Sequence, residues 1–67
     1  MMKDYRRIKI EFVDACLIFS DKHPDRAKGV SHYLILDDSE AIEIHYKDGS
    51  ISVYDPVYDM EIKVHDG

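Results

Sequence analysis

Hydrophobic and polar residues alternate most regularly in residues 40–55, on both sides of an Asp48-Gly49 pair. Asp-Gly between two alternating runs predicts a β-hairpin with a two-residue type I′ turn, in which both central residues have positive φ. A turn closed at this pair places Ile44 opposite Val53. The predicted core face then holds Ile44, Tyr46, Ile51 and Val53, and the opposite face holds Glu43, His45, Ser52 and Tyr54.

Three other segments also have the pattern of strands. Residues 7–12 and residues 60–65 alternate between polar and apolar, which is typical of half-buried strands. The side chains predicted to point inward from the second of these segments are Met60, Ile62 and Val64. Residues 32–36 are apolar on both faces, which predicts either a central strand that is covered on both sides or a strand at a subunit contact.

Residues 12–19 fit two structures. The phase of the alternation shifts near Val13, so a bend in a long strand would continue the strand pattern. Alternatively, a short helix would place Phe12, Ala15, Cys16 and Phe19 on one side. We favour the strand, because Val, Ile and Phe are frequent in strands and no good capping residues bracket the segment.

Together these segments predict an all-β fold in a single small domain, residues 1–67. Five or six short strands joined mainly by tight polar turns would form a small antiparallel sheet or an SH3-like barrel. The alternative is an α+β fold with one short helix at about residues 12–19. A chain of 67 residues has marginal stability as a monomer, so we also expect a homodimer.

Charge is unevenly distributed along the chain, whose net charge is −5. Residues 1–30 contain seven Lys or Arg and five acidic residues, whereas residues 31–67 contain two Lys and nine acidic residues. A general nucleic-acid binder has a clear basic surface, which the acidic second part does not provide. The acidity instead favours a protein partner with a basic surface.

Patterns typical of catalysis or metal binding are lacking in the sequence. Cys16 lies in an apolar run without a basic neighbour, and the four histidines do not have zinc-site spacing. The three glycines are isolated, so no phosphate-binding loop is indicated. We therefore predict no enzyme activity, no cofactor and no metal. The lone thiol and the short apolar runs predict a cytoplasmic protein that does not associate with membranes.

Acidic residues surround two tyrosines in the second part of the chain, and tyrosine is enriched at protein interfaces. The predicted partner-binding residues are Asp37, Asp38, Glu40, Glu43, Tyr54, Tyr58 and Asp59. The corresponding function is a non-enzymatic protein–protein interaction module. Its size and acidity fit the general profile of phage-encoded or mobile-element inhibitors and regulators. A second interpretation makes Tyr54 a core residue, covered by residues 15–19.

Two alternative functions use other parts of the chain. A small nucleic-acid-binding domain would combine phosphate contacts and stacking in its basic N-terminal segment. The residues for this role are Tyr5, Arg6, Arg7 and Lys9. A self-associating structural subunit would instead use the apolar residues 32–36 and the exposed edges of the sheet.

Overall fold

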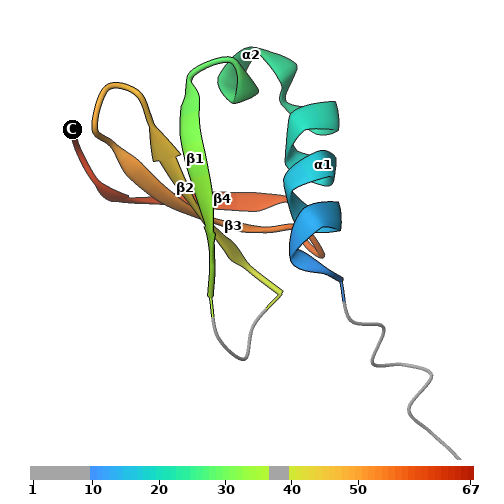
Figure 1. Ribbon diagram of the computed structural model, residues 1–67. Helices are drawn as coiled ribbons and strands as arrows, with labels where there is room; N and C mark the ends of the chain where they lie inside the picture. Colours follow the sequence, from blue (N-terminus) through green and yellow to red (C-terminus); the bar gives the residue numbers. More distant parts are fainter. Residues whose placement is uncertain (1–9, 37–39) are drawn as a thin grey trace, which may run out of the picture.

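The computed structural model describes residues 10–36 and 40–67 of the chain. Two helices come first and four strands follow. The helices are α1 (Phe12–Lys22) and α2 (Pro24–Ala27), and the strands are β1 (Val30–Ile35), β2 (Ile42–Tyr46), β3 (Ile51–Asp55) and β4 (Met60–His65). The strands form one antiparallel sheet in the order β1-β2-β3-β4, and α1 lies against one face of it (Figure 1).

The strand that we favoured over residues 12–19 is part of α1, so the helical alternative is correct. Ala15 and Phe19, one helical turn apart, are fully buried, whereas Val13 and Leu17 are exposed. Glu11, the N-cap residue of α1, makes no side-chain capping bond. Packing of this amphipathic face against the sheet therefore stabilises the helix and overrides the strand preference of individual residues. The fold is a small antiparallel sheet with a helix, mostly β by residue content.

The hairpin between β2 and β3 forms at the predicted position but in a different register. Ile44 lies opposite Ser52 instead of Val53. The Tyr46 amide donates to the Ser50 carbonyl at 2.9 Å, which leaves three residues in the loop. Among the described loop residues only Gly49 has positive φ, at 94°. The two-residue type I′ turn is therefore wrong, and the hairpin has a three-residue loop with glycine at its left-handed position.

This shift of one residue inverts β3 relative to the prediction, because successive strand residues point to opposite faces. Strand β2 has the predicted orientation, with Ile44 buried and Tyr46 packed against the core. In β3, however, Ser52 and Tyr54 are buried. Strand β4 follows the same phase, so the prediction that its apolar residues point inward is also wrong. The exposed side chains of β4 are Met60, Ile62 and Val64.

Strand β1 is an edge strand of the described sheet, not the central strand that its apolar sequence suggested. The other edge is β4, and no pairing joins β1 to β4, so the described sheet is open and does not close into a barrel. Four strands are present in the described residues, fewer than the predicted five or six. Residues 7–9 of the predicted first strand lie outside the described residues, and Phe12 begins α1.

The core lies between α1 and one face of the sheet. Its fully buried apolar residues are Ala15, Phe19, Ile42, Ile44 and Tyr54. The Phe19 ring meets the Tyr54 ring edge to face, with 5.0 Å between centroids. We call the side packed against α1 the covered face. By strand pairing its residues are Val30, Tyr33, Ile35, Ile42, Ile44, Tyr46, Ser52, Tyr54, Glu61 and Lys63.

The other side of the sheet is called the open face. By strand pairing its residues are His32, Leu34, Glu43, His45, Ile51, Val53, Asp55, Met60, Ile62 and His65, with Val64 at the irregularity beside the Ile51–His65 pair. Neither helix packs on this face, because α1 lies on the opposite side of the sheet (Figure 1).

Candidate functional site

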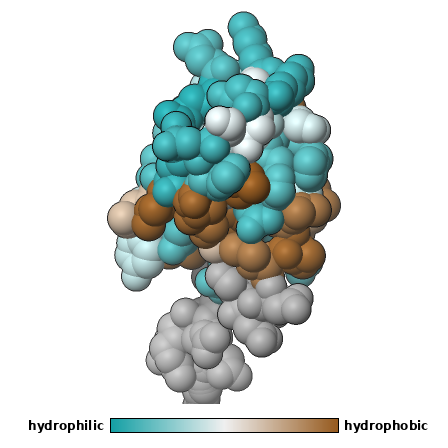
Figure 2. Space-filling view, turned by 90° about the vertical axis from the view of Figure 1, so that its left-hand side faces the viewer, coloured by the Kyte–Doolittle hydropathy of each residue, from teal (hydrophilic) through white to brown (hydrophobic). Residues whose placement is uncertain are grey.

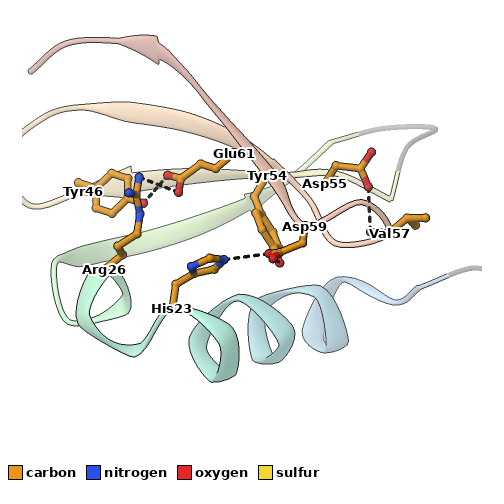
Figure 3. Close-up of polar contacts among 8 residues, drawn as sticks. All are labelled: His23, Arg26, Tyr46, Tyr54, Asp55, Val57, Asp59 and Glu61. Carbon is orange, nitrogen blue, oxygen red and sulfur yellow. Dashed lines mark hydrogen bonds and ion pairs between the residues drawn. The ribbon is translucent and has the colours of Figure 1, made fainter.

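A set of polar contacts fastens the helical segment to the covered face, and we call it the polar clasp (Figure 3). Its residues are His23, Arg26, Tyr46, Tyr54, Asp59 and Glu61. The first two come from the segment that contains α1 and α2, and the others come from β2, β3, β4 and the turn between β3 and β4. The clasp has two halves, each centred on a carboxylate.

Asp59 is the centre of the first half. Its Oδ1 atom accepts a hydrogen bond from the Tyr54 hydroxyl at 2.7 Å and lies 2.8 Å from Nε2 of His23. An ionised carboxylate only accepts hydrogen bonds, so Nε2 of His23 is the donor. The backbone of Asp59 has a φ of 55°, in the left-handed region, which lets the turn after β3 reverse within a few residues.

These contacts shift the pKa values of Asp59 and Tyr54. The hydrogen bond from His23, together with that from Tyr54, lowers the pKa of Asp59 below its ordinary value of 3.8. Burial and the bond to Asp59 raise the pKa of Tyr54 well above its ordinary value of 10.0. At neutral pH this half therefore holds an ionised carboxylate and a protonated phenol.

Glu61 is the centre of the second half. Arg26 Nη2 lies 2.7 Å from Glu61 Oε1, and the Tyr46 hydroxyl donates to Glu61 Oε2. Burial works against the charge of Glu61, but the bonds from Tyr46 and Arg26 hold its pKa below the ordinary value of 4.5. Burial, followed by the bond to Glu61, raises the pKa of Tyr46 to about 12. The short helix α2, which begins at Pro24, places Arg26 over this carboxylate.

The clasp acts as a brace between helix and sheet. Its carboxylates are ionised and its phenols are protonated across the neutral range, so the hydrogen bonds between them keep the same donors and acceptors there. Each carboxylate already accepts two internal contacts, from His23 and Tyr54 or from Arg26 and Tyr46. The clasp thus positions the turn after β3, whose outer side chains are available for contact.

Other side chains that could take part in chemistry do not form a second site in the described residues. Burial raises the pKa of the Cys16 thiol, which packs against the core and stays protonated at neutral pH. Ser52 Oγ is buried and makes no hydrogen bond of standard geometry within the described part of the chain, but its hydroxyl helps to lower the pKa of Glu61. Among residues 10–36 and 40–67, no group of three or more His, Cys, Asp or Glu side chains is placed to hold a metal ion.

The structure separates the predicted partner-binding residues. Tyr54 is fully buried under α1, so the interpretation that made it a core residue is correct. Glu43 lies on the open face and accepts a bond from His45 Nε2 at 2.8 Å. Asp59 belongs to the clasp, although its side chain remains 40% exposed. Asp37 and Asp38 lie outside the described residues.

The remaining predicted residues gather at one end of the sheet, around the turn between β3 and β4. Tyr58 in this turn is 73% exposed. The pairing of Ile42 with Tyr54 also brings Glu40 to this end. The Asp55 carboxylate accepts a bond from the Val57 amide at 2.9 Å, which shapes the turn (Figure 3). We call Glu40, Asp55, Tyr58 and Asp59 the acidic end.

Sequence reasoning missed His23, Arg26 and Glu61 as members of a joint site. They are far apart in the chain, and His23 and Asp59 are separated by 36 positions. The alternating pattern placed Glu61 on the solvent side of its strand, because its neighbours are apolar. Pro24 was the one local signal, since it can begin the helical turn that carries Arg26. The proposed nucleic-acid residues Tyr5, Arg6, Arg7 and Lys9 lie outside the described residues, so that function stays a prediction.

Comparisons with known proteins assign no family. The chain matches no protein-family model, and it has no significant match among curated protein sequences or solved structures. Within residues 10–36 and 40–67, neither helix is long and apolar enough to cross a membrane.

Proposed function

We propose that the protein is a non-enzymatic interaction module that binds a basic protein surface through its acidic end. The observation that carries this proposal is Tyr58, which is 73% exposed in a turn that also contains Asp55 and Asp59. An exposed tyrosine offers a large contact area and loses little side-chain entropy when it is buried by a partner. Carboxylates around it favour cationic residues on that partner.

The turn that carries Tyr58 is held in place before any partner arrives. Asp55 fixes its beginning through the Val57 amide, and Asp59 fixes its end through Tyr54 and His23. A preorganised loop spends less free energy on ordering when it binds. The polar clasp therefore supports binding at the acidic end without contacting the partner.

The charge distribution supports a basic partner. Residues 31–67 contain two Lys and nine acidic residues, so this second part carries most of the negative charge of the chain. Such an imbalance accelerates encounters with a positively charged protein and makes the association rate sensitive to salt. A protein that binds nucleic acid has a positively charged surface and would be such a partner. Inhibition or regulation of such a protein, in the manner of phage or mobile-element regulators, is the role we propose.

Quantitative affinity capture tests the proposal. The full chain is immobilised, and lysate proteins retained by the wild type are compared with those retained by Tyr58→Ala and by Glu40→Lys. Asp66→Lys is the matched control, because Asp66 is 85% exposed in its side chain and lies beyond β4 at the opposite end of that strand (Figure 1).

We expect a basic protein that is retained by the wild type and by Asp66→Lys but lost with both variants of the acidic end. Retention should also weaken as salt rises, because screening reduces the attraction between exposed charges. If no retained protein depends on Tyr58 or Glu40, the acidic end is not a binding surface.

A further inference from the structure

The open face of the sheet is a second surface with a different character. Four of its apolar side chains, from the edge strands β1 and β4, are 44–59% exposed: Leu34, Met60, Ile62 and Val64. Half-buried Ile51 and Val53 of β3 adjoin the three side chains from β4, and Glu43 and His45 of β2 lie between this group and Leu34. Figure 2 views the molecule from the side opposite α1, where an apolar band crosses its middle and hydrophilic residues lie above. Monomeric proteins seldom expose a contiguous apolar surface of this kind, which usually marks an interface.

We propose that this face packs against the same face of a second copy of the chain. The open face shares only Asp55 with the acidic end, and its apolar side chains have no part in the function proposed above, so the inference does not depend on that function. Three features of the molecule support this pairing: the size of the existing core, the area of the open face, and the charges on that face.

The existing core is small. Five apolar residues are fully buried in the described part of the chain, and all of them lie between α1 and the covered face. Domains below roughly 70–80 residues generally need a metal, disulfides or oligomerisation in addition to one such core. The only cysteine is Cys16, so an intramolecular disulfide is excluded. Two open faces packed together would provide a second apolar layer from side chains that are already in place.

The area of the face reaches the lower limit for a specific dimer. Four strands spaced about 4.8 Å apart, with about five residues of 3.3 Å rise each, give a face of roughly 19 by 17 Å. With the relief of the side chains, two such faces bury on the order of 1,000 Å² in total, near the smallest size of specific interfaces. We therefore expect reversible association at micromolar concentrations, not a permanent dimer.

The charges on the open face permit a second copy to approach. Its titratable residues are His32, Glu43, His45, Asp55 and His65. Glu43 is already bonded to His45, and the rings of His45 and His32 stack with 4.5 Å between centroids and 19° between planes. The carboxylate of Glu61 belongs to the covered face, and those of Glu40 and Asp59 lie at the acidic end. An identical apolar face fits here better than a strongly basic partner.

Sedimentation velocity of the full chain tests the proposal from about 1 µM to about 500 µM, the range in which small interfaces associate. The variant Ile62→Lys places a charge in the apolar part of the open face, opposite Val53. Leu17→Lys is its matched control, because Leu17 is 60% exposed on the outer side of α1 and Ile62 is 59% exposed on β4. Far-UV circular dichroism checks that both variants fold. If Ile62→Lys does not fold, Ile62→Thr replaces it, since threonine retains the β-branched shape.

We expect the wild type and Leu17→Lys to approach twice the chain mass of 7.8 kDa as concentration rises, and Ile62→Lys to stay at the chain mass. The thermal unfolding midpoint should also rise with concentration for the wild type and Leu17→Lys alone, because association stabilises the folded state by mass action. A wild type that is monomeric at the highest concentration overturns the proposal. The same conclusion follows if Ile62→Lys dimerises like the wild type, or if Leu17→Lys also abolishes the dimer. A monomeric wild type that loses a captured protein on Ile62→Lys would assign the face to a different partner.

Discussion

The two faces of the sheet are built from the same four strands, but one is covered by a helix and the other is exposed. On the covered face, Ile42 and Ile44 are buried under α1, and Phe19 fills the space between helix and sheet. On the open face, Ile62 is similarly apolar but is largely exposed. The difference shows that the position of one helix, and not the hydrophobicity of the strands, decides which side becomes the core.

The comparison also explains why a carboxylate points inward from β4. Once α1 occupies the covered face, the register of the hairpin directs Glu61 toward the helical segment. Arg26 and Tyr46 then compensate its burial with hydrogen bonds. The covered face thus combines an apolar centre with the polar clasp, and the open face has an apolar band without such a brace.

The largest expected effect comes from removing the contact between the helix and the covered face. Phe19→Ala should lower the free energy of unfolding by about 3–5 kcal/mol, because it removes a fully buried ring and leaves a cavity. A single core in so small a chain supplies about the same amount, so the variant should be largely unfolded at room temperature. Urea titration followed by circular dichroism measures the change.

Ile62→Ala is the counterpart on the open face. Measured at low micromolar concentration, it should change the free energy of unfolding by less than about 1 kcal/mol, since Ile62 is already exposed in one chain. Equal losses at the two positions would show that the two faces do not differ in the way described.

The second effect concerns the brace on the covered face. Tyr54→Phe keeps the buried ring but removes the hydroxyl that donates to Asp59, and it should cost about 1–2 kcal/mol. Tyr58→Phe is the control, because Tyr58 is exposed in the adjoining turn. Urea titration of both variants checks this. Equal stability of Tyr54→Phe and the wild type would show that the bond from Tyr54 to Asp59 does not stabilise the fold.

An effect of similar size is expected at the turn that sets the register of β3. Gly49 has a φ of 94°, and a Cβ there would lie 3.3 Å from the Cα of Gly67. Gly49→Ala should therefore destabilise the protein by about 1–2 kcal/mol. Gly29→Ala is the control, because its Cβ would make only ordinary contacts, the nearest at 3.5 Å. Thermal unfolding should separate the two variants, and equal midpoints would mean that the loop tolerates alanine.

The smallest expected effect is the response to acid, because water screens the partly exposed Asp59 and burial opposes the charge of Glu61. The folded-state pKa of Glu61 is below 4.5 and that of Asp59 is below 3.8. The unfolded chain thus binds protons first as pH falls, so their stabilisation is complete above about pH 4.5 and is lost as pH falls through the folded-state values.

Urea midpoints measured from neutral pH down to about pH 3 should fall for the wild type and fall less for Glu61→Gln. Asp66→Asn, which changes an exposed carboxylate outside the clasp, should behave as the wild type. A Glu61→Gln variant with the full acid response would show that Glu61 does not contribute to it.

The sequence was sufficient to locate the hairpin, the strand at residues 60–65 and the inward side of β2. It could not give the register, because Asp-Gly fits both two-residue and three-residue loops. Strand β3 has Ile51 and Val53 on one side and Tyr54 on the other, so its own pattern does not select the buried side. That selection is made by α1, which residue preferences suggested was a strand.

The candidate site was predictable only in part. Glu40, Tyr58 and Asp59 were expected at a partner-binding surface, and the structure brings them to one end of the sheet, although binding there remains a proposal. Tyr54 was expected on the side away from the core but lies in the core, because the three-residue loop shifts the register of β3 by one residue. The bonds of His23 and Arg26 to the sheet join distant parts of the chain, and no local pattern signals them.

The left-handed backbone of Asp59 has a consequence for how the chain can vary. Glycine would adopt its φ of 55° at no steric cost, but it would offer nothing to Tyr54 and His23. Asparagine tolerates the same backbone, but it would replace the ionised acceptor with a neutral amide. Glutamate keeps the charge but is less suited to the left-handed region and has a longer reach. Backbone shape and acceptor chemistry therefore both favour aspartate at position 59, and in a saturation library we expect this position to accept fewer substitutions than its exposed neighbour Tyr58.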